Sequence, residues 1–280
     1  MRWLCLIVVA GCSFEAPAAI TSPDAAGAGV DAPPGEPPPP PPPGDTPPPP
    51  DAPPARTCTT SDGALEVCLE LDDAFGTGIA LDGSGHLRDA TLDSVTTATR
   101  DVPVVSQAAG ISISTTIRLA ETSALDMQTA TLVAWVQRSS LPNSGGRFGV
   151  VDIGRRQAAM GIDDTGHVVC FVKTDDTIWV RPGGSTRLNE WALAACTYDP
   201  PMLCAYSFRN GSSSPEVTCG NTDGASLDTS STSGTAVGAL FDVDTGSLQS
   251  HLKGNVDGVR IYSRALSQDE LCNSGNIPGC

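Results

Sequence analysis

The chain from residue 57 to residue 280 consists of short runs in which apolar and polar residues alternate. In the run ALEVCLELD, the valine and leucines of residues 65–71 fall on one face, and two glutamates and a cysteine fall on the other. This two-residue period is that of a half-buried strand. Similar runs follow, each closed by Gly, Asp, Asn, Ser or Pro, and none shows sustained helical periodicity. The pattern predicts an all-β fold, an antiparallel sandwich or jelly roll.

The end of the chain carries the most specific local signal. Residues 255–258 (NVDG) form a bend, because Gly tolerates positive φ and Asn and Asp bond to nearby backbone. A strand is expected from Val259 to Tyr262. Ser267 and Glu270 have the spacing of a capping box, which predicts a short helix after that strand.

The first residues direct the chain out of the cytoplasm. A basic residue followed by an apolar run predicts a secretory signal peptide over residues 1–11, since a spanning helix needs roughly 20 apolar residues. The motif Val-Ala-Gly-Cys at residues 9–12 resembles the lipobox of bacterial lipoproteins, which implies acylation of Cys12. Ser13 then favours sorting to the outer membrane and cell surface. The alternative is an ordinary secreted protein with a chance cysteine at this position.

Residues 12–56 are expected to be a disordered linker. The segment is dominated by Pro, Ala, Gly and Asp, so it cannot bury enough apolar surface to form a core. Its proline runs favour polyproline II, which gives a semi-rigid spacer on the order of 100 Å long at about 3.1 Å per residue. The folded domain is therefore placed at residues 57–280.

The cysteines indicate an oxidising compartment. Ten are present; Cys5 is removed with the signal peptide and Cys12 is assigned to lipid, so an even number remains for disulfides. Those eight allow about a hundred pairings. The strand pattern favours Cys170–Cys196 and Cys204–Cys219, and the four terminal cysteines are expected to pair locally as Cys58–Cys68 and Cys272–Cys280.

Three blocks in order resemble one family. Residues 117–137 (IRLAETSALDMQTATLVAWVQ), residues 188–211 (LNEWALAACTYDPPMLCAYSFRNG) and residues 254–271 (GNVDGVRIYSRALSQDEL) are similar to the LamG-like jelly roll of the concanavalin A-like lectin/glucanase superfamily. The early turn LDGSG at residues 81–85 fits as well. The resemblance implies an antiparallel two-sheet jelly-roll sandwich with its first and last strands side by side. It is less specific for function, because this fold carries many sites.

A glucanase site is not expected. Enzymes of this superfamily carry Glu-x-Asp-x-x-Glu, and a retaining mechanism needs two carboxyl groups about 5–5.5 Å apart. The nearest match is EVCLELDD, in which Glu66 and Glu70 share a face but Phe75 stands where the final glutamate would be. The solvated face of an edge strand is the simpler interpretation. No serine elbow, phosphate loop or zinc motif is present, so we expect no enzyme activity.

Charge argues against nucleic acid as a partner. The formal net charge is −16 and the basic residues are dispersed, so no phosphate-binding stripe forms. Paired aspartates at residues 163–164, 175–176 and 242–244 do not follow the spacing of an EF-hand loop. We interpret them as solvated turns.

Aromatic side chains can stack on sugar rings, which makes their positions informative. Trp135 and Trp191 occupy motif positions of the family and are expected to be framework residues. Trp179 and Tyr206 are the candidates for contact with carbohydrate. Packing in the core or pairing between strands is the alternative for both.

Asp257 has two interpretations. The resemblance places it near Asp82 in the early turn, where both aspartates would lie in Gly-containing bends. Calcium prefers six to eight oxygen ligands from carboxylates and backbone carbonyls, so the pair could hold a structural calcium ion. The alternative is that Asp257 bonds only the amides of its own turn.

Taken together, the sequence predicts a surface-displayed lipoprotein whose domain binds carbohydrate, either a polysaccharide or a glycoprotein. An adhesion or structural module with a protein partner is the alternative. A glycan-active enzyme without the usual glucanase motif is the third possibility. The sequence does not specify the oligomeric state.

Overall fold

A computed structural model describes residue 58 and residues 62–277, apart from residues 73–75, 102–105, 176, 211, 213, 225 and 231–232. The predicted signal peptide, Cys12, the Pro-rich linker and Cys280 lie outside these residues. The described part is an antiparallel two-sheet sandwich with one short α-helix. The predicted all-β fold is confirmed. No helix in the described part has the length and apolar character needed to cross a membrane.

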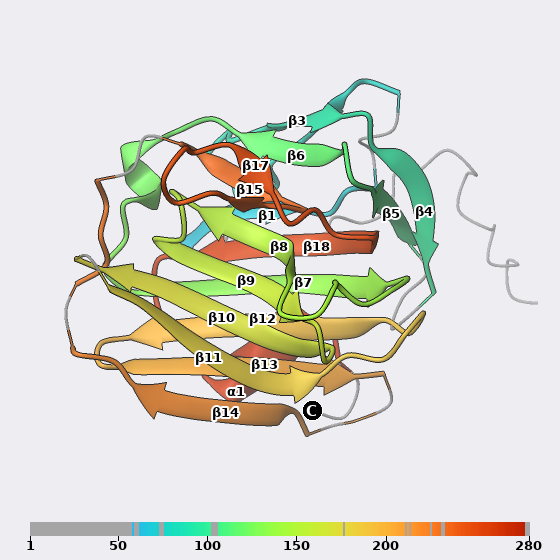
Figure 1. Cartoon of the computed structure of the whole chain (residues 1–280). Coiled ribbons are helices and arrows are strands. Elements are labelled where there is room, and N and C mark those ends of the chain that lie inside the picture. The colour runs from blue at the N-terminus through green and yellow to red at the C-terminus, as the bar shows by residue number, and fades with distance from the viewer. Residues whose placement is uncertain are drawn as a thin grey trace, which may run out of the picture. The chain divides into compact units, whose positions relative to one another are not determined.

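Sheet A has the strand order β14-β13-β12-β7-β18-β5-β4, and β1 also pairs with β18. Its strands are β1 (Leu65–Leu69), β4 (Thr96–Arg100), β5 (Ser106–Ile111), β7 (Ala130–Arg138), β12 (Ala192–Asp199), β13 (Met202–Arg209), β14 (Glu216–Asn221) and β18 (Gly254–Tyr262). In Figure 1 this sheet lies behind the other one.

Sheet B faces the viewer in Figure 1 and has the order β11-β10-β9-β8-β15-β6-β3-β2. Its strands are β2 (Ile79–Ala80), β3 (Ala90–Asp93), β6 (Thr116–Leu119), β8 (Arg147–Ile153), β9 (Ala158–Asp163), β10 (His167–Thr174), β11 (Thr177–Ser185) and β15 (Thr235–Val237). Strands β16 (Leu240–Phe241) and β17 (Leu248–Gln249) form a separate hairpin, and a 3-10 turn covers Ser123–Leu125.

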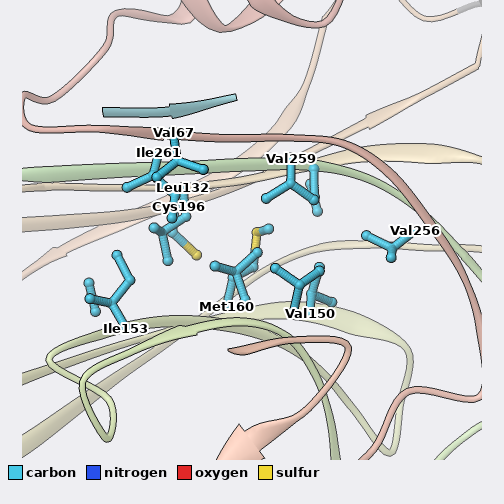
Figure 2. Close-up of a cluster of buried hydrophobic side chains, with 14 of the residues drawn as sticks. Val67, Leu132, Val150, Ile153, Met160, Cys196, Val256, Val259 and Ile261 are labelled. Carbon is cyan, nitrogen blue, oxygen red and sulfur yellow. The ribbon is translucent and has the colours of Figure 1, made fainter. Parts of the chain in front are cut away.

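The main core lies between the two sheets. Alternate residues of facing strands fill it, and Figure 2 shows members from both sheets meeting there, including Leu132, Val150, Met160, Val256 and Ile261. Nearly all of these side chains are excluded from water. Burial of apolar area at about 25 cal/mol per Å² is the main force that holds the sheets together.

A second apolar cluster covers the outer face of sheet A. The helix α1 (Gln268–Ser274) packs Leu271 against Trp135, Trp191 and other residues of that face. The helix begins with the expected capping box, since Ser267 and Glu270 each bond the other's backbone amide. Trp135 and Trp191 are both 3% exposed, which agrees with the framework role predicted for them.

The first and last strands lie side by side, as the resemblance implied. Leu65 of β1 pairs with Tyr262 of β18, and Leu69 pairs with Val259. The other half of β18 pairs with β5. Because β18 also pairs with β7 along most of its length, it is the central strand of sheet A.

Three of the four predicted disulfides are confirmed, namely Cys58–Cys68, Cys170–Cys196 and Cys204–Cys219. The Cys170–Cys196 bridge joins β10 of sheet B to β12 of sheet A, whereas Cys204–Cys219 links two neighbouring strands of sheet A. Cys272 is also disulfide-bonded, and its predicted partner Cys280 lies outside the described residues.

Candidate functional site

Asp257 is a buried ion-pair partner in the middle of sheet A. Its carboxylate is fully excluded from water and lies 2.6 Å from Nε of Arg100 on β4. The Ser106 hydroxyl donates to it at 2.7 Å, and the Gly258 amide donates at 2.7 Å. Burial raises the pKa of Asp257 to about 7, although these three donors favour its charged form. The predicted bend at residues 255–258 is wrong, because these residues lie within β18, whose pairing with β7 is irregular between Asp257 and Arg260. Asp257 does accept the amide of Gly258, as the turn interpretation expected, and sequence reasoning missed Arg100.

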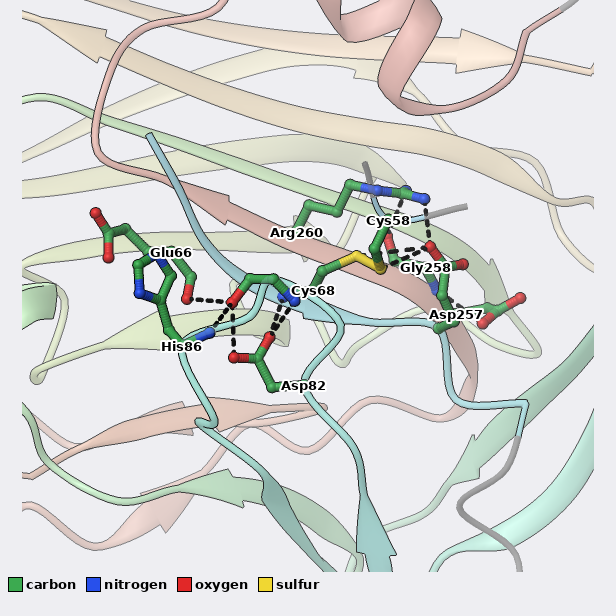
Figure 3. The surroundings of a disulfide bond; sticks show 10 residues. Cys58, Glu66, Cys68, Asp82, His86, Asp257, Gly258 and Arg260 are labelled. Carbon is green, nitrogen blue, oxygen red and sulfur yellow. Dashed lines mark hydrogen bonds and ion pairs between the residues drawn. A yellow bond between two sulfur atoms is a disulfide. The ribbon is translucent and has the colours of Figure 1, made fainter. Parts of the chain in front are cut away.

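Asp82 holds a different turn together. Its carboxylate accepts from the amides of Cys68, Ser84 and Arg88 and from the Ser84 hydroxyl, at 2.7 to 3.0 Å. These hydrogen bonds outweigh burial and hold the pKa of Asp82 below its ordinary value. Figure 3 shows Asp82 and Asp257 with the Cys58–Cys68 disulfide between them.

The structure therefore does not gather the two aspartates into one prepared cation site. Their oxygens already accept from protein donors, and a guanidinium occupies the position beside Asp257 where a cation would bind. One cluster of potential metal ligands occurs in the described part, formed by Cys58, Cys68 and Glu70. Because its two sulfurs are joined in a disulfide, they are not free thiolate ligands. Calcium binding stays a prediction that has no support from these residues.

The two aromatic candidates lie in different parts of the sandwich. Trp179 on β11 packs against the main core, and its indole N–H donates to Thr174 Oγ1 at 3.0 Å. Tyr206 on β13 is half-buried on the outer face of sheet A and stacks on Phe208, with ring centroids 6.3 Å apart. Trp179 thus shows the core packing that was the alternative for it, while it remains partly buried, and contact of its ring with carbohydrate stays a prediction. Such contact also stays a prediction for Tyr206.

Glu66 of β1 and Glu70, which follows this strand, are each paired with an arginine. Glu66 lies 2.7 Å from Arg88, and Glu70 lies 2.6 Å from Arg260. Strand β1 pairs only with β18 among the described strands, so it is an edge strand as expected, but the face that carries Glu66 and Cys68 is largely buried and not solvated. These carboxylates are thus engaged in holding the early turn and β18 in place.

The most unusual side-chain arrangement lies on the outer face of sheet B, where Phe171 projects from β10. Its ring is 1% exposed and packs with Ala159, Val169 and Leu240 in a small apolar cluster. The guanidinium carbon of Arg147 lies 4.8 Å from the ring centroid, and that of Arg156 lies 5.4 Å from it. We call Arg147, Arg156 and Phe171 the arginine cluster.

Local structure explains how the two arginines converge. Arg147 begins β8, and Arg156 follows the end of β8 in the turn to β9. The turn requires positive φ at Arg155 (56°) and Arg156 (70°), a conformation that costs energy for residues with a side chain. The carboxylate of Asp152 offsets this cost by accepting the Arg156 amide at 2.6 Å.

Asp152 also fixes the β16–β17 hairpin over the sheet, because its second oxygen accepts the Phe241 amide at 2.8 Å. The residue is completely buried, and this burial raises its pKa to about 7. Because the pKa is raised on folding, the folded state holds the Asp152 proton more tightly than the unfolded state does. The contribution of protonated Asp152 to the free energy of unfolding is therefore fully present below pH 3.8 and is lost as the pH rises to about 7.

Both guanidinium groups of the arginine cluster lack a hydrogen-bond or ion-pair partner within the described part of the chain. Nε of Arg156 is buried without any acceptor. By contrast, the guanidinium groups of Arg88, Arg100 and Arg260 are each bonded to a carboxylate. Asp152 and Asp242 lie within electrostatic range of Arg156 but form no ion pair with it. Unpaired guanidinium groups can bond a ligand that accepts hydrogen bonds, which makes the arginine cluster a candidate site.

Sequence reasoning missed this site for an identifiable reason. The basic residues are dispersed along the chain, and Arg147 and Arg156 are separated by the whole of β8. They approach one another only because their long side chains both reach Phe171 on β10, two strands away. The pair Arg155-Arg156 after a Gly was the available signal, but the pair does not reveal which member faces the sheet.

Comparison with known families identifies the fold. The family model described as the concanavalin A-like lectin/glucanases superfamily matches residues 111–272, which is more than half of the chain. The chain belongs to this superfamily. The resemblance found from the three sequence blocks is thereby confirmed. The arginine cluster lies within the matched residues of this concanavalin A-like domain.

Solved structures agree on the fold. The binding domain of Paraclostridial Mosquitocidal Protein 1 matches with a TM-score of 0.55 and 14% identity, over 75% of this chain and 51% of that one. Domain 4 of AbnA, an extracellular arabinanase from Geobacillus stearothermophilus solved with arabinotriose, matches with a TM-score of 0.52 and 15% identity, over 75% of this chain and 98% of that one. Botulinum neurotoxin type C, whose cell entry depends on two ganglioside molecules, matches with a TM-score of 0.53 and 12% identity, over 76% of this chain and 51% of that one.

This chain spans about half the length of the two toxin chains that it matches. At such low identity the likeness concerns the fold alone. No curated protein sequence matches this chain.

Proposed function

We propose that this protein is an exported, lipid-anchored lipoprotein whose concanavalin A-like domain binds carbohydrate without acting on it. The family and the similar domains support carbohydrate as the ligand, since one neighbour was solved with arabinotriose and another depends on gangliosides. These ligands belong to the neighbours, and the identity of the sugar for this chain is part of the proposal.

The observation that carries the proposal is the arginine cluster on the outer face of sheet B. A guanidinium group presents five N–H donors in one plane, and sugars present many oxygen acceptors. In this cluster both guanidinium groups lie against the Phe171 ring, and both arginines are partly exposed, so N–H groups other than the buried Nε of Arg156 can bond a ligand. Val180, which pairs with Phe171 across the ladder, is 38% exposed and offers an apolar surface beside them.

The proposal is tested by applying the purified full-length protein to a glycan array, with calcium and with a chelator. We expect saturable binding to a defined group of glycans and no release of reducing sugar from any of them. Release of reducing sugar would establish the enzyme alternative. If the protein binds no glycan on the array but binds saturably to a purified surface protein stripped of its glycans, the adhesion alternative is established.

Lipid anchoring has its own test. Replacing Cys12 by serine should move the protein from the membrane fraction to the soluble fraction, because one or more acyl chains on that cysteine supply the membrane affinity. Ser13→Ala is the matched control and should leave the protein in the membrane fraction. If the Cys12→Ser protein still sediments with membranes and migrates unchanged on a gel, the lipoprotein proposal is wrong.

A further inference from the structure

We infer that the arginine cluster selects acidic glycans, with the carboxylate or sulfate group of a sugar placed between Arg147 and Arg156. This inference rests on the proposed carbohydrate-binding function and specifies its ligand.

The carboxylates nearest the arginine cluster bond their own turns, Asp163 and Asp242 each through Oδ1. Asp163 lies directly opposite Arg147 in the β8–β9 ladder and would be its natural partner. Its carboxylate instead accepts from the Thr165 amide and hydroxyl and from the His167 amide, at 2.6 to 2.9 Å. Because Asp163 bonds its own turn, Arg147 has no ion-pair partner at this position.

The same is true around Arg156. The Asp152 oxygens accept two backbone amides, and Asp242 accepts the Asp244 and Thr245 amides at 3.1 and 2.8 Å. Asp242 is close enough to Arg156 for an electrostatic effect on its pKa, yet the two form no ion pair. In a chain of net charge −16, cations that escape pairing with several nearby acids are available for an external anion.

The two guanidinium groups also lie close to each other. The two guanidinium carbons can be no farther apart than the sum of their distances to the ring centroid, about 10 Å. At this upper limit, two acidic groups on neighbouring residues of a polymer can each bond one fork, and one carboxylate or sulfate can bridge the forks where they approach more closely. The cation–π contact holds each fork against the ring, and the in-plane N–H groups other than the buried Nε of Arg156 can bond a ligand.

A structural role is the competing explanation, because the arginine stems also shield Phe171, Val169 and Ala159 from water. Such shielding needs the methylene groups and not the forked charge. A variant that keeps the charge and removes the fork therefore distinguishes shielding from anion binding. Measuring stability and binding on the same variants distinguishes the two roles as well.

The experiment measures binding of the full-length protein to polygalacturonate, dextran sulfate and neutral dextran. The first two present a carboxylate and a sulfate, so they also distinguish which anion is preferred. We expect binding to at least one acidic polymer, no binding to dextran, and weakening as salt is raised. Arg147→Gln and Arg156→Gln should each weaken binding about tenfold or more, as loss of a charge-assisted pair does, and the double variant should not bind measurably.

Two further variants keep the test decisive. Arg187→Gln removes one charge from an exposed arginine outside the cluster, whose side chain is 59% exposed, and should bind within about twofold of the parent protein. Arg147→Lys keeps the charge and most of the stem but not the fork, so it should melt like the parent protein and still bind more weakly.

The outcomes separate the inference from the proposed function. Binding to neutral glycans alone, or binding to an acidic polymer that the Gln variants leave unchanged, overturns the inference while carbohydrate binding stands. Binding to no glycan at all overturns the proposed function and the inference with it. If Arg147→Lys binds the acidic polymer more weakly only in proportion to a loss of folded protein, the arginines serve only to shield the apolar cluster, and the inference is also overturned.

Discussion

Replacing Asp257 by alanine should lower the free energy of unfolding by about 3–5 kcal/mol, as removal of one partner from a buried ion pair does. The substitution leaves the Arg100 guanidinium, whose side chain is 8% exposed, without its carboxylate. It also removes the acceptor for the Ser106 hydroxyl and the Gly258 amide. Urea unfolding of the full-length protein measures the loss.

Two controls define the cause. Glu190→Ala breaks the exposed Arg187–Glu190 pair, in which both side chains are more than half exposed, and should change stability by less than about 1 kcal/mol. The double variant Arg100→Ala with Asp257→Ala should lose less than the sum of the two single losses, because neither charge is then left alone. The loss from Asp257→Ala should be the same in calcium and in chelator. A loss seen only when calcium is present would make Asp257 a calcium ligand and contradict the ion-pair account.

The second large effect concerns the bridge between the sheets. Replacing Cys170 and Cys196 by alanine should lower the free energy of unfolding by about 3.5 kcal/mol from chain entropy alone, given their separation of 26 residues. Both cysteines lie in the buried core between the sheets, so the lost sulfur atoms add a packing cost. Thermal and urea unfolding of the oxidised proteins measure the change.

The Cys204–Cys219 bridge is the matched control for that prediction. It closes a loop with a separation of 15 residues, and Cys219 is exposed. It also joins residues that already face each other in the β13–β14 ladder, so the strands stay together without it. Its removal should therefore cost less. An equal or larger loss for this surface bridge would mean that the sheet-spanning disulfide does not hold the sandwich together.

Features that depend on near neighbours in the chain were predictable. The alternation in β1 and β18 follows from the period of a strand, and the capping box at Ser267 follows from side chains three residues apart. The cysteine pairs of adjacent strand-like runs were also accessible, since each of the three confirmed bridges closes a loop of at most 26 residues.

Features that depend on register between distant strands were not predictable. Arg100 and Asp257 are 157 residues apart, and only the order β18-β5-β4 brings them into contact. The inward turn of Trp179 likewise depends on its pairing with Val172 in the β10–β11 ladder. The arginine cluster requires three strands and a strained turn to be in place, so no short sequence motif predicts it.

A map of where an acidic glycan contacts the protein decides between the arginine cluster and the outer face of sheet A. The full-length protein, labelled for NMR, is titrated with a short oligosaccharide of the acidic polymer that binds. The arginine cluster predicts shifts in the Nε–Hε signals of Arg147 and Arg156 and in the ring signals of Phe171, with the Tyr206 ring unchanged. Shifts confined to Tyr206 and the outer face of sheet A, with the two arginines silent, would contradict it.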